Sequence, residues 1–315
     1  MENSCDKQYV KSAMEKYDEL VKITKDNMNL HKEKDKPLTV KVGSKYYGIL
    51  CTKETVESSK ILKLRSDDII ITSYPKCGST WLRQIILQLV INDYWESEIP
   101  QFLASPMIEF MGSSVVDQYP SPRVLKTHYD FDDCPKSDEC KFIYIVRNPK
   151  DAIVSYYHHM TNLSFYHFQE ASFEEFFNHF FSKEMEWGNY FDNVKSWIPM
   201  LDKPNVLFLV YENLKKDLPS NILKIAKFLG GDVSKKYQTV EDIKDIVEKS
   251  SFNFMKKNVN RFTEDPTIPT FIRKGTTKDW KNHLTKDQSD KVDELFKKTF
   301  ANTSLEYLWL DEMKF

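Results

Sequence analysis

Cysteine and glycine are scarce in this 315-residue sequence, and neither forms a pattern. The five cysteines are odd in number and include no C-x-x-C pair; they are Cys5, Cys51, Cys77, Cys134 and Cys140. This argues against a disulfide framework and a zinc site, and it fits a reducing compartment. The 8 glycines mark no linker, and no repeat is present. We therefore predict a single domain over 1–315, with 1–36 as an N-terminal helical extension and 37–315 as the core.

An excess of charge of one sign is also absent, because 45 Lys and Arg face 47 Asp and Glu, a net charge of -2. Without a global positive field we expect no nucleic-acid partner and no binding to an anionic membrane, so any anion site must be local. The first residues lack the apolar core of a signal peptide, and polar residues interrupt the longest apolar stretch, which begins at Trp81. These absences predict a soluble cytoplasmic protein.

The sequence does contain short, nearly continuous apolar runs, at 69–71, 124–125, 142–146 and 206–210. Runs of this kind suit strands that are buried on both faces. Longer stretches with helical spacing separate them, for example 82–90 and 222–229. The alternation predicts an α/β fold with a parallel sheet, preceded by a hairpin that turns at Gly43-Ser44. Ligands of such folds gather at the carboxyl ends of the strands.

The residues that follow the four runs are mostly cationic. The strand ends read Tyr74-Pro75-Lys76, Lys126-Thr127-His128, Arg147-Asn148-Pro149 and Tyr211-Glu212. Because parallel strands end at one edge of a sheet, we expect these side chains to share a site. Considered alone, Arg147 is more often a surface ion pair, and a histidine such as His128 is more often satisfied in the core or on the surface.

The stretch "TSYPKCGSTW", residues 72–81, is typical of a loop that holds an anion. Gly78 permits close backbone approach, the amides of 77–81 open a helix, and Ser79 and Thr80 add hydroxyl donors beside Lys76. An ordinary strand–helix turn is the alternative. Compared with the signature G-x-x-x-x-G-K-[ST], the lysine precedes the glycine and no Lys-Ser/Thr pair follows. Arg147 and Tyr211 also stand where a nucleotide hydrolase places a magnesium-binding carboxylate, so we expect no metal.

A second anion site is expected after the third run. Asn148 suits a helix N-cap, Pro149 suits the first helical position, and Ser155 follows Arg147 by about two turns. Both side chains could therefore meet one phosphate. Together with the aromatics Trp81 and Phe252, the two sites suggest a nucleotide with phosphates at both ends of its ribose and a stacked base.

With these residues assembled, the sequence resembles the cytosolic sulfotransferases, which transfer a sulfuryl group from 3'-phosphoadenosine-5'-phosphosulfate (PAPS) to a small acceptor. Three ordered motifs carry the resemblance: "YPKCGSTW" is similar to the 5'-phosphosulfate loop, "VRNPKDAIVSYYHHM" to the 3'-phosphate segment, and "FIRKGTTKDWKNHLT" to the carboxyl-terminal RKG signature. The resemblance spans roughly 40–310. It implies a five-stranded parallel sheet flanked by helices, with a P-loop-like 5'-phosphosulfate loop.

The resemblance also implies roles for individual residues. Lys76, Lys126 and His128 are similar to two catalytic lysines and the general base, for which an imidazole of ordinary pKa would suit neutral pH. The residues implied for the nucleotide are Lys76, Cys77, Gly78, Ser79, Thr80, Trp81, Arg147, Ser155, Tyr211, Ser250, Phe252, Arg273, Lys274 and Gly275. The residues implied for the acceptor are Phe102, Met107, His128, His159 and Trp187, which could equally be core.

Several positions depart from the family pattern, among them Ser79, which replaces a usual threonine. Cys77 replaces a serine, which could make the site sensitive to thiol modification, and Lys278 replaces the second glycine of the RKG signature. The dimer motif is degenerate in "KNHLTKDQSD", which leaves both a homodimer and a monomer open. Two other functions stay open: a non-catalytic protein that binds adenosine bisphosphate or a small molecule, and a nucleotide kinase on a related fold. The acceptor, a phenol, steroid-like alcohol or aryl amine, is not specified.

Overall fold

A parallel β-sheet forms the centre of the molecule in the computed structural model, which describes residues 7–31, 33, 36–263 and 272–315. Within these residues the sheet has four strands in the order β4-β3-β5-β6. They are β3 (Ile69–Thr72), β4 (Val124–Thr127), β5 (Lys141–Val146) and β6 (Val206–Val210). Each predicted apolar run forms one strand, which confirms the α/β prediction. The predicted count of five strands is wrong for the described residues, because the fifth came from the resemblance and corresponds to no buried apolar run.

Burial on both faces explains why these segments become strands. Every residue of β3 and β4 is buried, and the neighbouring strands pair in parallel register, with Ile71 opposite both Lys126 and Ile143. Apolar, largely β-branched side chains suit such a doubly covered sheet. Because all four strands run in the same direction, Thr72, Thr127, Val146 and Val210 end at one edge.

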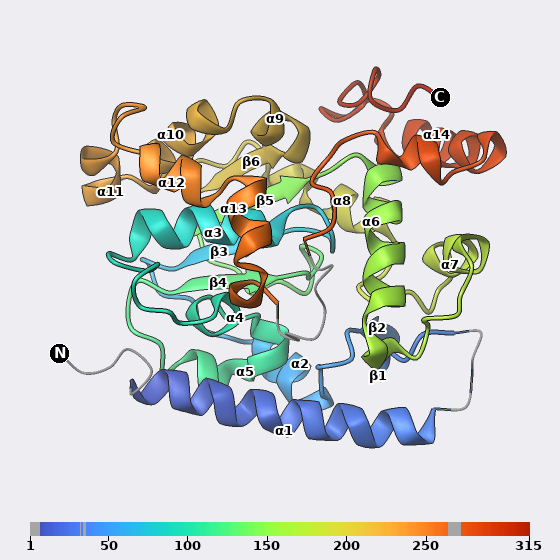
Figure 1. The fold of residues 1–315 in the computed structure, drawn as a ribbon, viewed down its shortest axis with the longest axis horizontal. Coiled ribbons are helices and arrows are strands. Elements are labelled where there is room, and N and C mark those ends of the chain that lie inside the picture. Colours follow the sequence, from blue (N-terminus) through green and yellow to red (C-terminus); the bar gives the residue numbers. More distant parts are fainter. Residues whose placement is uncertain (1–6, 32, 34–35, 264–271) are drawn as a thin grey trace.

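Helices flank this sheet and carry the rest of the chain (Figure 1). Before and around β3 and β4 lie α1 (Gln8–Leu30), α2 (Lys53–Lys60), α3 (Ser79–Val90), α4 (Gln101–Ala104) and α5 (Ile108–Val116). After β5 come α6 (Pro149–Asn162), α7 (Phe173–Phe180) and α8 (Tyr190–Trp197). After β6 come α9 (Tyr211–Lys216), α10 (Leu218–Leu229), α11 (Gly231–Lys236), α12 (Lys244–Lys249), α13 (Phe252–Lys257) and α14 (Lys286–Phe300). Short 3-10 turns span Ser164–Tyr166, Ile198–Met200, Val259–Arg261 and Asp279–Asn282.

The start of α6 follows the cap that the sequence predicts. Asn148 caps α6, since its side-chain oxygen accepts a hydrogen bond from the Lys150 amide, and Pro149 occupies the first helical position. The expected hairpin is present as β1 (Val40–Val42) and β2 (Lys45–Tyr47), with Gly43 at a φ of 62° in the turn.

The N-terminal helix α1 runs along one side of the molecule and packs against α5 (Figure 1). Its buried face includes Ala13 and Leu20, and the Thr24 hydroxyl donates a hydrogen bond to the Ile49 carbonyl. Parts of the predicted extension, residues 1–6, 32 and 34–35, lie outside the described residues. The buried apolar side chains form one cluster that reaches from Val10 to Met313. Division of the chain into one domain with an N-terminal extension stays a prediction.

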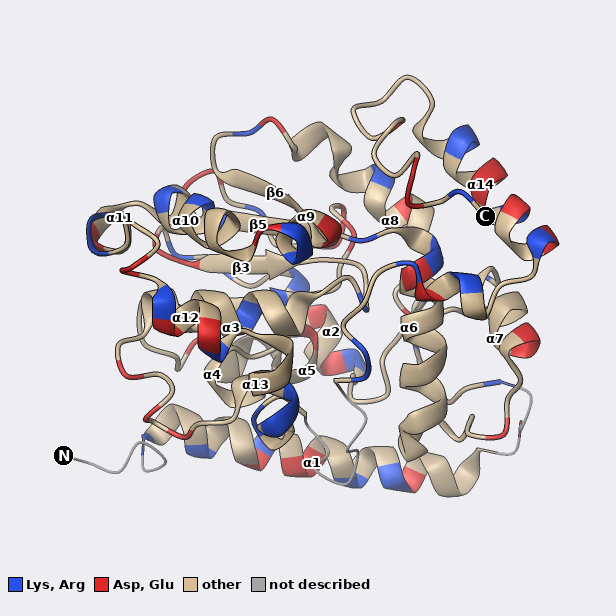
Figure 2. Ribbon diagram, turned by 45° about the horizontal axis from the view of Figure 1, so that its top comes forward, with Lys and Arg blue, Asp and Glu red and all other residues tan. Residues whose placement is uncertain are grey.

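Charged residues of both signs alternate along the surface helices, as α1 and α14 show (Figure 2). This fits the net charge of -2 and leaves anion binding to local groupings of cations. Among the described residues, no helix combines the length and the apolar character that a membrane span requires.

Candidate active site

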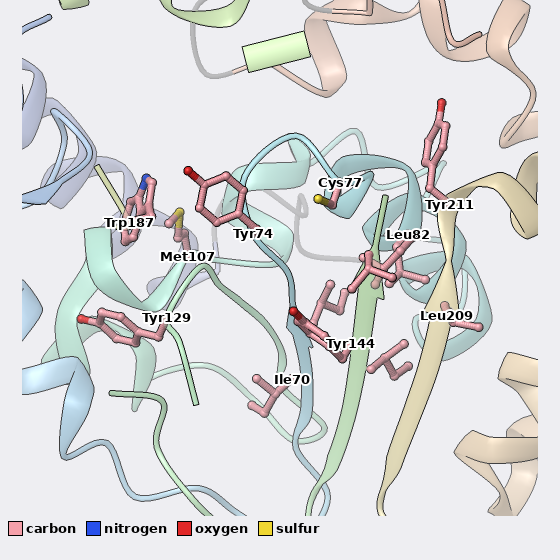
Figure 3. Close-up of a cluster of buried hydrophobic side chains, with 14 of the residues drawn as sticks. Ile70, Tyr74, Cys77, Leu82, Met107, Tyr129, Tyr144, Trp187, Leu209 and Tyr211 are labelled. Atoms are coloured by element: carbon pink, nitrogen blue, oxygen red, sulfur yellow. The ribbon is translucent and has the colours of Figure 1, made fainter. Parts of the chain in front are cut away.

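A cavity of about 450 Å³ opens at the carboxyl ends of the strands. Figure 3 shows Tyr74, Cys77 and Tyr211 at this edge, beyond Ile70 and Tyr144 in the sheet. The cavity wall includes most of the residues that the sequence singled out: Lys76, Gly78, Ser79, Thr80, Trp81, Met107, Lys126, His128, Arg147, Ser155, His159, Trp187, Tyr211, Ser250, Phe252, Arg273, Lys274 and Gly275. Two predicted residues, Cys77 and Phe102, are not part of this wall.

The loop between β3 and α3 has a backbone that only a few residue types adopt easily. Lys76 has a φ of 68° and Gly78 a φ of 105°, both in the left-handed region. A Cβ at Gly78 would lie 2.7 Å from Cδ2 of Tyr211, so a larger residue would clash as well as strain the backbone. The turn starts α3 at Ser79, where the first amides of a helix lack intrahelical acceptors. The loop can therefore hold an anion at a helix N-terminus.

Cys77 lies beneath this loop and is fully buried. Burial raises the pKa of its thiol to about 12, which outweighs the lowering effect of the nearby Arg147. A thiolate is the reactive form of cysteine, and it is disfavoured here. Burial therefore argues against the predicted sensitivity of Cys77 to thiol reagents, and the sequence does not reveal that the side chain is buried.

Arg147 follows β5 and reaches across the cavity wall. Its guanidinium lies 4.4 Å from the ring centroid of Tyr211, and its Nη atoms donate to the carbonyls of Lys76, at 3.3 Å, and Thr276, at 3.2 Å. It is buried, and Ser155 reaches the same cavity from the second turn of α6. A cation held against an aromatic ring keeps a fixed position, which suits recognition of a phosphate.

Aromatic side chains border the cavity next to these cations. The indole Nε1 of Trp81 donates a hydrogen bond to the Ser250 carbonyl at 2.8 Å, and its ring lies 5.6 Å from that of Tyr211. Phe252 begins α13 and packs against Gly275, where a Cβ would lie only 2.4 Å from Cδ2 of the Phe252 ring. These contacts bring residues far apart in the sequence to one wall suited to a nucleobase.

Arg273 and Lys274 line the cavity, but both are paired with Asp279 in this structure, at 2.7 Å and 2.8 Å. Burial alone would raise the pKa of Asp279, yet hydrogen bonds from Lys274, Asn282 and Arg273 lower it below its ordinary value. The predicted motif begins at 271, which lies outside the described residues. Lys278, which replaces the family's second glycine, has a φ of 63°, so a conformation suited to glycine is kept at this position.

His128 follows β4, and its ring is oriented by a single strong contact. Nδ1 lies 2.7 Å from the Ser73 carbonyl, which can only accept a hydrogen bond. Nδ1 must therefore carry the proton, and Nε2 bears the lone pair that a general base needs. The Trp187 ring is 5.5 Å away, and Lys126 reaches the same cavity from the end of β4.

The pKa of His128 lies well below 6.5, because burial disfavours the charged imidazolium and Lys126 adds repulsion. The expectation of an ordinary imidazole pKa is therefore wrong. The sequence places His128 beside a lysine, but it does not show that the ring is enclosed. A lowered pKa keeps the imidazole neutral, and so able to accept a proton, at every pH near neutrality.

Glu109 holds the backbone of His128 and was not anticipated. Its Oε1 accepts hydrogen bonds from the Thr127 hydroxyl at 2.6 Å and from the His128 amide at 2.7 Å. Burial raises the pKa of this carboxyl to about 7. The only signal in the sequence is an acidic residue inside the apolar stretch "MIEFMG", where a solvated helix face would otherwise be expected.

The wall beyond His128 is aromatic. Of the residues predicted to contact the acceptor, Met107, His159 and Trp187 line the cavity. Phe102 instead packs against Tyr17, with ring centroids 4.9 Å apart, and does not reach the wall. Other residues of this wall were not anticipated, namely Tyr17, Arg83, Phe110, Phe165, Tyr166 and Glu186. They come from segments whose sequence shows only a core-like pattern. Among the residues that the structure describes, no group of three or more His, Cys, Asp or Glu is placed to hold a metal ion.

Comparison with known proteins gives one consistent family. Residues 66–304 match the model of the sulfotransferase domain. Sulfotransferase 6B1 of Danio rerio is 34% identical over 280 residues, which cover 87% of this chain and 92% of the relative. Sulfotransferase 1C2 of Homo sapiens is 36% identical, with coverage of 82% and 93%.

Solved structures agree with this fold. Mouse sulfotransferase SULT7A1, complexed with PAP, superposes with a TM-score of 0.73 at 29% identity and covers 87% of this chain and 98% of its own. Retinol dehydratase, in a complex with retinol and PAP, gives a TM-score of 0.74 at 24% identity over 86% of this chain and 92% of its own, and it supports the fold alone. The extent of these matches, along both the chain and its relatives, shows that the protein belongs to the sulfotransferase family.

Proposed function

We propose that this sulfotransferase binds PAPS at the strand ends and transfers its sulfuryl group to a hydroxyl or amine of a small aromatic or hydrophobic acceptor. One observation carries the proposal: His128, with Nε2 unprotonated, lines the same cavity as Lys76, Lys126 and Arg147. A base, cations and an anion-binding loop in one enclosed space are what transfer of a charged group to an acceptor requires.

The donor nucleotide would occupy the wall formed by the β3–α3 loop, α6 and α13. The amides at 77–81, with Ser79 and Thr80, suit the 5'-phosphate, because a helix N-terminus carries partial positive charge. Arg147 and Ser155 suit the 3'-phosphate, and the segment of Arg273, Lys274 and Gly275 would cover it. Trp81 and Phe252 suit the adenine, with Tyr211 and Ser250 near the nucleoside.

The chemistry requires little beyond positioning and neutralisation of charge. The acceptor oxygen forms a bond to sulfur while the bond between sulfur and the bridging oxygen breaks, and the acceptor proton passes to Nε2 of His128. Lys76 and Lys126 stabilise the charge that develops on the leaving side. Glu109 acts through His128: it accepts hydrogen bonds from the His128 amide and the Thr127 hydroxyl, and these fix the end of β4 from which the imidazole projects.

Localisation and assembly belong to the same proposal. We infer a cytoplasmic enzyme from the scattered cysteines and from the resemblance to the cytosolic sulfotransferases. The degenerate dimer motif lies at the start of α14, where Lys286 and Asp290 pair with each other on the surface. This segment could form the interface of a homodimer. Light scattering of the purified chain at two concentrations would measure the molar mass and so distinguish a dimer from a monomer.

A turnover assay tests the proposal against its alternatives. Radiolabelled PAPS and a panel of phenols, steroids and amines should give labelled product, and EDTA should leave the rate unchanged. Binding of PAP without product from any acceptor would favour a binding protein. Magnesium-dependent consumption of ATP would favour a nucleotide kinase. A chain that ignores PAPS would refute the proposal.

A further inference from the structure

The start of α6 holds the stretch of chain that leads from the nucleotide wall to α14. Residues 272–276, which we call the cap segment, form no helix or strand and line the cavity. The 3-10 turn Asp279–Asn282 follows them and packs against α6 (Figure 1). A segment without regular backbone hydrogen bonds takes its position from contacts with its neighbours. The placement of Arg273 and Lys274 therefore depends on what anchors the chain after them.

Asp151 supplies such an anchor. Its Oδ2 accepts a hydrogen bond from the Lys278 amide at 2.7 Å, and its Oδ1 accepts one from the Trp280 amide at 3.2 Å. Asp151 is 2% exposed and is not part of the cavity wall, so it acts on a ligand only through other residues. Both of its oxygens are engaged by the backbone just after the cap segment.

The anchored turn has a conformation that needs support. Lys278 has a φ of 63°, in the left-handed region that residues other than glycine disfavour. A hydrogen bond from its amide to a carboxylate is charge-assisted and stabilises this conformation. Trp280 is fully buried, with Nζ of Lys150 4.4 Å from its ring centroid and its Nε1 donating to the Glu312 carbonyl. Two consecutive residues of α6, Lys150 and Asp151, therefore hold the turn.

Arg147 connects the same stretch to the expected 3'-phosphate site. It precedes Asp151 by four residues, and its guanidinium donates to the Thr276 carbonyl at 3.2 Å. Burial raises the pKa of Asp151, while the charge of Arg147 and the amides of Lys278 and Trp280 favour the ionised carboxylate. Arg147 and Asp151 thus hold the chain at Thr276 and Lys278, directly after the residues that would cover the phosphate.

We propose that Asp151 is a positioning residue for the donor: by holding the amides of Lys278 and Trp280, it keeps the cap segment where Arg273 and Lys274 reach the 3'-phosphate. A carboxylate near a phosphate repels it, so charge alone would make Asp151 a hindrance to binding. Positioning acts in the opposite direction, because a binding group displaced by about 1 Å can lose about 10²-fold of its effect. This inference rests on the proposed function and specifies how the site recognises the donor's 3'-phosphate.

Two substitutions separate position from charge. Asp151→Asn removes the charge and keeps the shape, but its amide group faces one of the two backbone donors without an acceptor. Asp151→Glu keeps the charge, but its longer side chain moves the carboxylate away from both amides. Calorimetric titrations of the full chain with PAP and with 5'-AMP give a ratio of affinities that isolates the 3'-phosphate, because a general loss of packing weakens both nucleotides. We expect both variants to lower this ratio about tenfold or more, the usual size of a hydrogen bond to a charged group.

Asp242→Asn is the matched control. Asp242 also accepts hydrogen bonds from two backbone amides, those of Gln238 and Thr239, but it is exposed and does not line the cavity. This variant should keep the parent's ratio of affinities. Hydrogen exchange of the parent chain needs no substitution: with PAP bound, the amides of Lys278 and Trp280 should exchange slowly.

The inference is overturned if Asp151→Asn keeps or raises the ratio, if Asp151→Glu keeps it, if Asp242→Asn lowers it as much, or if the two amides of the parent exchange as fast as in an unfolded chain. Binding of PAP by the parent reports separately on the proposed function. Its absence refutes the donor site and this inference together, whereas PAP binding with unchanged ratios in the Asp151 variants refutes this inference alone.

Discussion

Gly275→Ala tests whether the contact between Gly275 and Phe252 supports the nucleotide site. Gly275 has a φ of 61°, and a Cβ there would lie 2.4 Å from Cδ2 of Phe252. Ordinary contact begins near 3.4 Å, so the ring must move by about 1 Å, the difference between these two distances. A displacement of this size in a positioning residue can cost about 10²-fold in turnover. Loss of one base–aromatic stack costs about 1–3 kcal/mol, which corresponds to about 5-fold to 150-fold in PAP affinity.

Gly43→Ala separates this contact from backbone strain. Gly43 has a φ of 62°, nearly the same as Gly275, but a Cβ there would meet no described atom within 4 Å, and the residue does not line the cavity. Both variants place an alanine in the left-handed region, which lowers the free energy of unfolding by about 1–2 kcal/mol. Thermal melts should therefore show this loss of stability in both variants, and the clash with Phe252 should add a further loss in Gly275→Ala only.

The affinity for PAP and the rate of turnover with PAPS should then differ between Gly275→Ala and Gly43→Ala. Gly275→Ala is expected to lose affinity and rate, while Gly43→Ala keeps both. The reasoning fails if Gly275→Ala binds PAP like the parent chain, or if Gly43→Ala loses affinity to the same extent, because strain alone would then account for the effect.

Three further substitutions test other parts of the site. His128→Ala should slow turnover by about 10²-fold or more, the usual effect of losing a general base, with PAP affinity nearly intact; unchanged turnover would contradict the role. Arg147→Ala should weaken PAP more than 5'-AMP, and an unchanged ratio of the two affinities would contradict a 3'-phosphate site. Glu186 has a folded pKa raised from 4.5 to about 7, so the folded chain binds the extra proton and the parent loses stability as pH rises between these values. The free energy of unfolding of Glu186→Gln, relative to that of the parent, should therefore rise by about 3 kcal/mol between pH 4.5 and 7 and stay constant above pH 7. Denaturant melts that show no pH-dependent rise would oppose this account.

Much of the scaffold could be predicted because it follows from local rules. Strands buried on both faces need continuous apolar runs, so β3, β5 and β6 are visible in the sequence as such. Asn148 and Pro149 mark a helix start through backbone chemistry alone. Because parallel strands end at one edge, Lys76, Lys126, Arg147 and Tyr211, which follow the four runs, line one cavity.

The rest depended on contacts between distant segments. Glu109 and Glu186 occur in stretches that look like core or a solvated face, and only the fold brings them to Thr127 and Tyr166. Phe102 illustrates the opposite case, since an aromatic at a plausible position packs against α1 instead. Burial, which no local pattern specifies, also determines the pKa of His128.

Burial also explains how acidic groups can border a cationic site without cancelling it. The same desolvation that keeps His128 neutral raises the pKa of Glu109 and Glu186 to about 7, so both carboxyl groups lose much of their charge near neutrality. Asp279 differs, because hydrogen bonds from Arg273 and Lys274 keep it ionised. Closure of these two cations over a 3'-phosphate must therefore exchange one anion for another. The free energy gained in that exchange is only the difference between binding a phosphate and binding the Asp279 carboxylate. Arg147 is held instead by the Tyr211 ring and two carbonyls, so it can bind a phosphate without giving up a carboxylate.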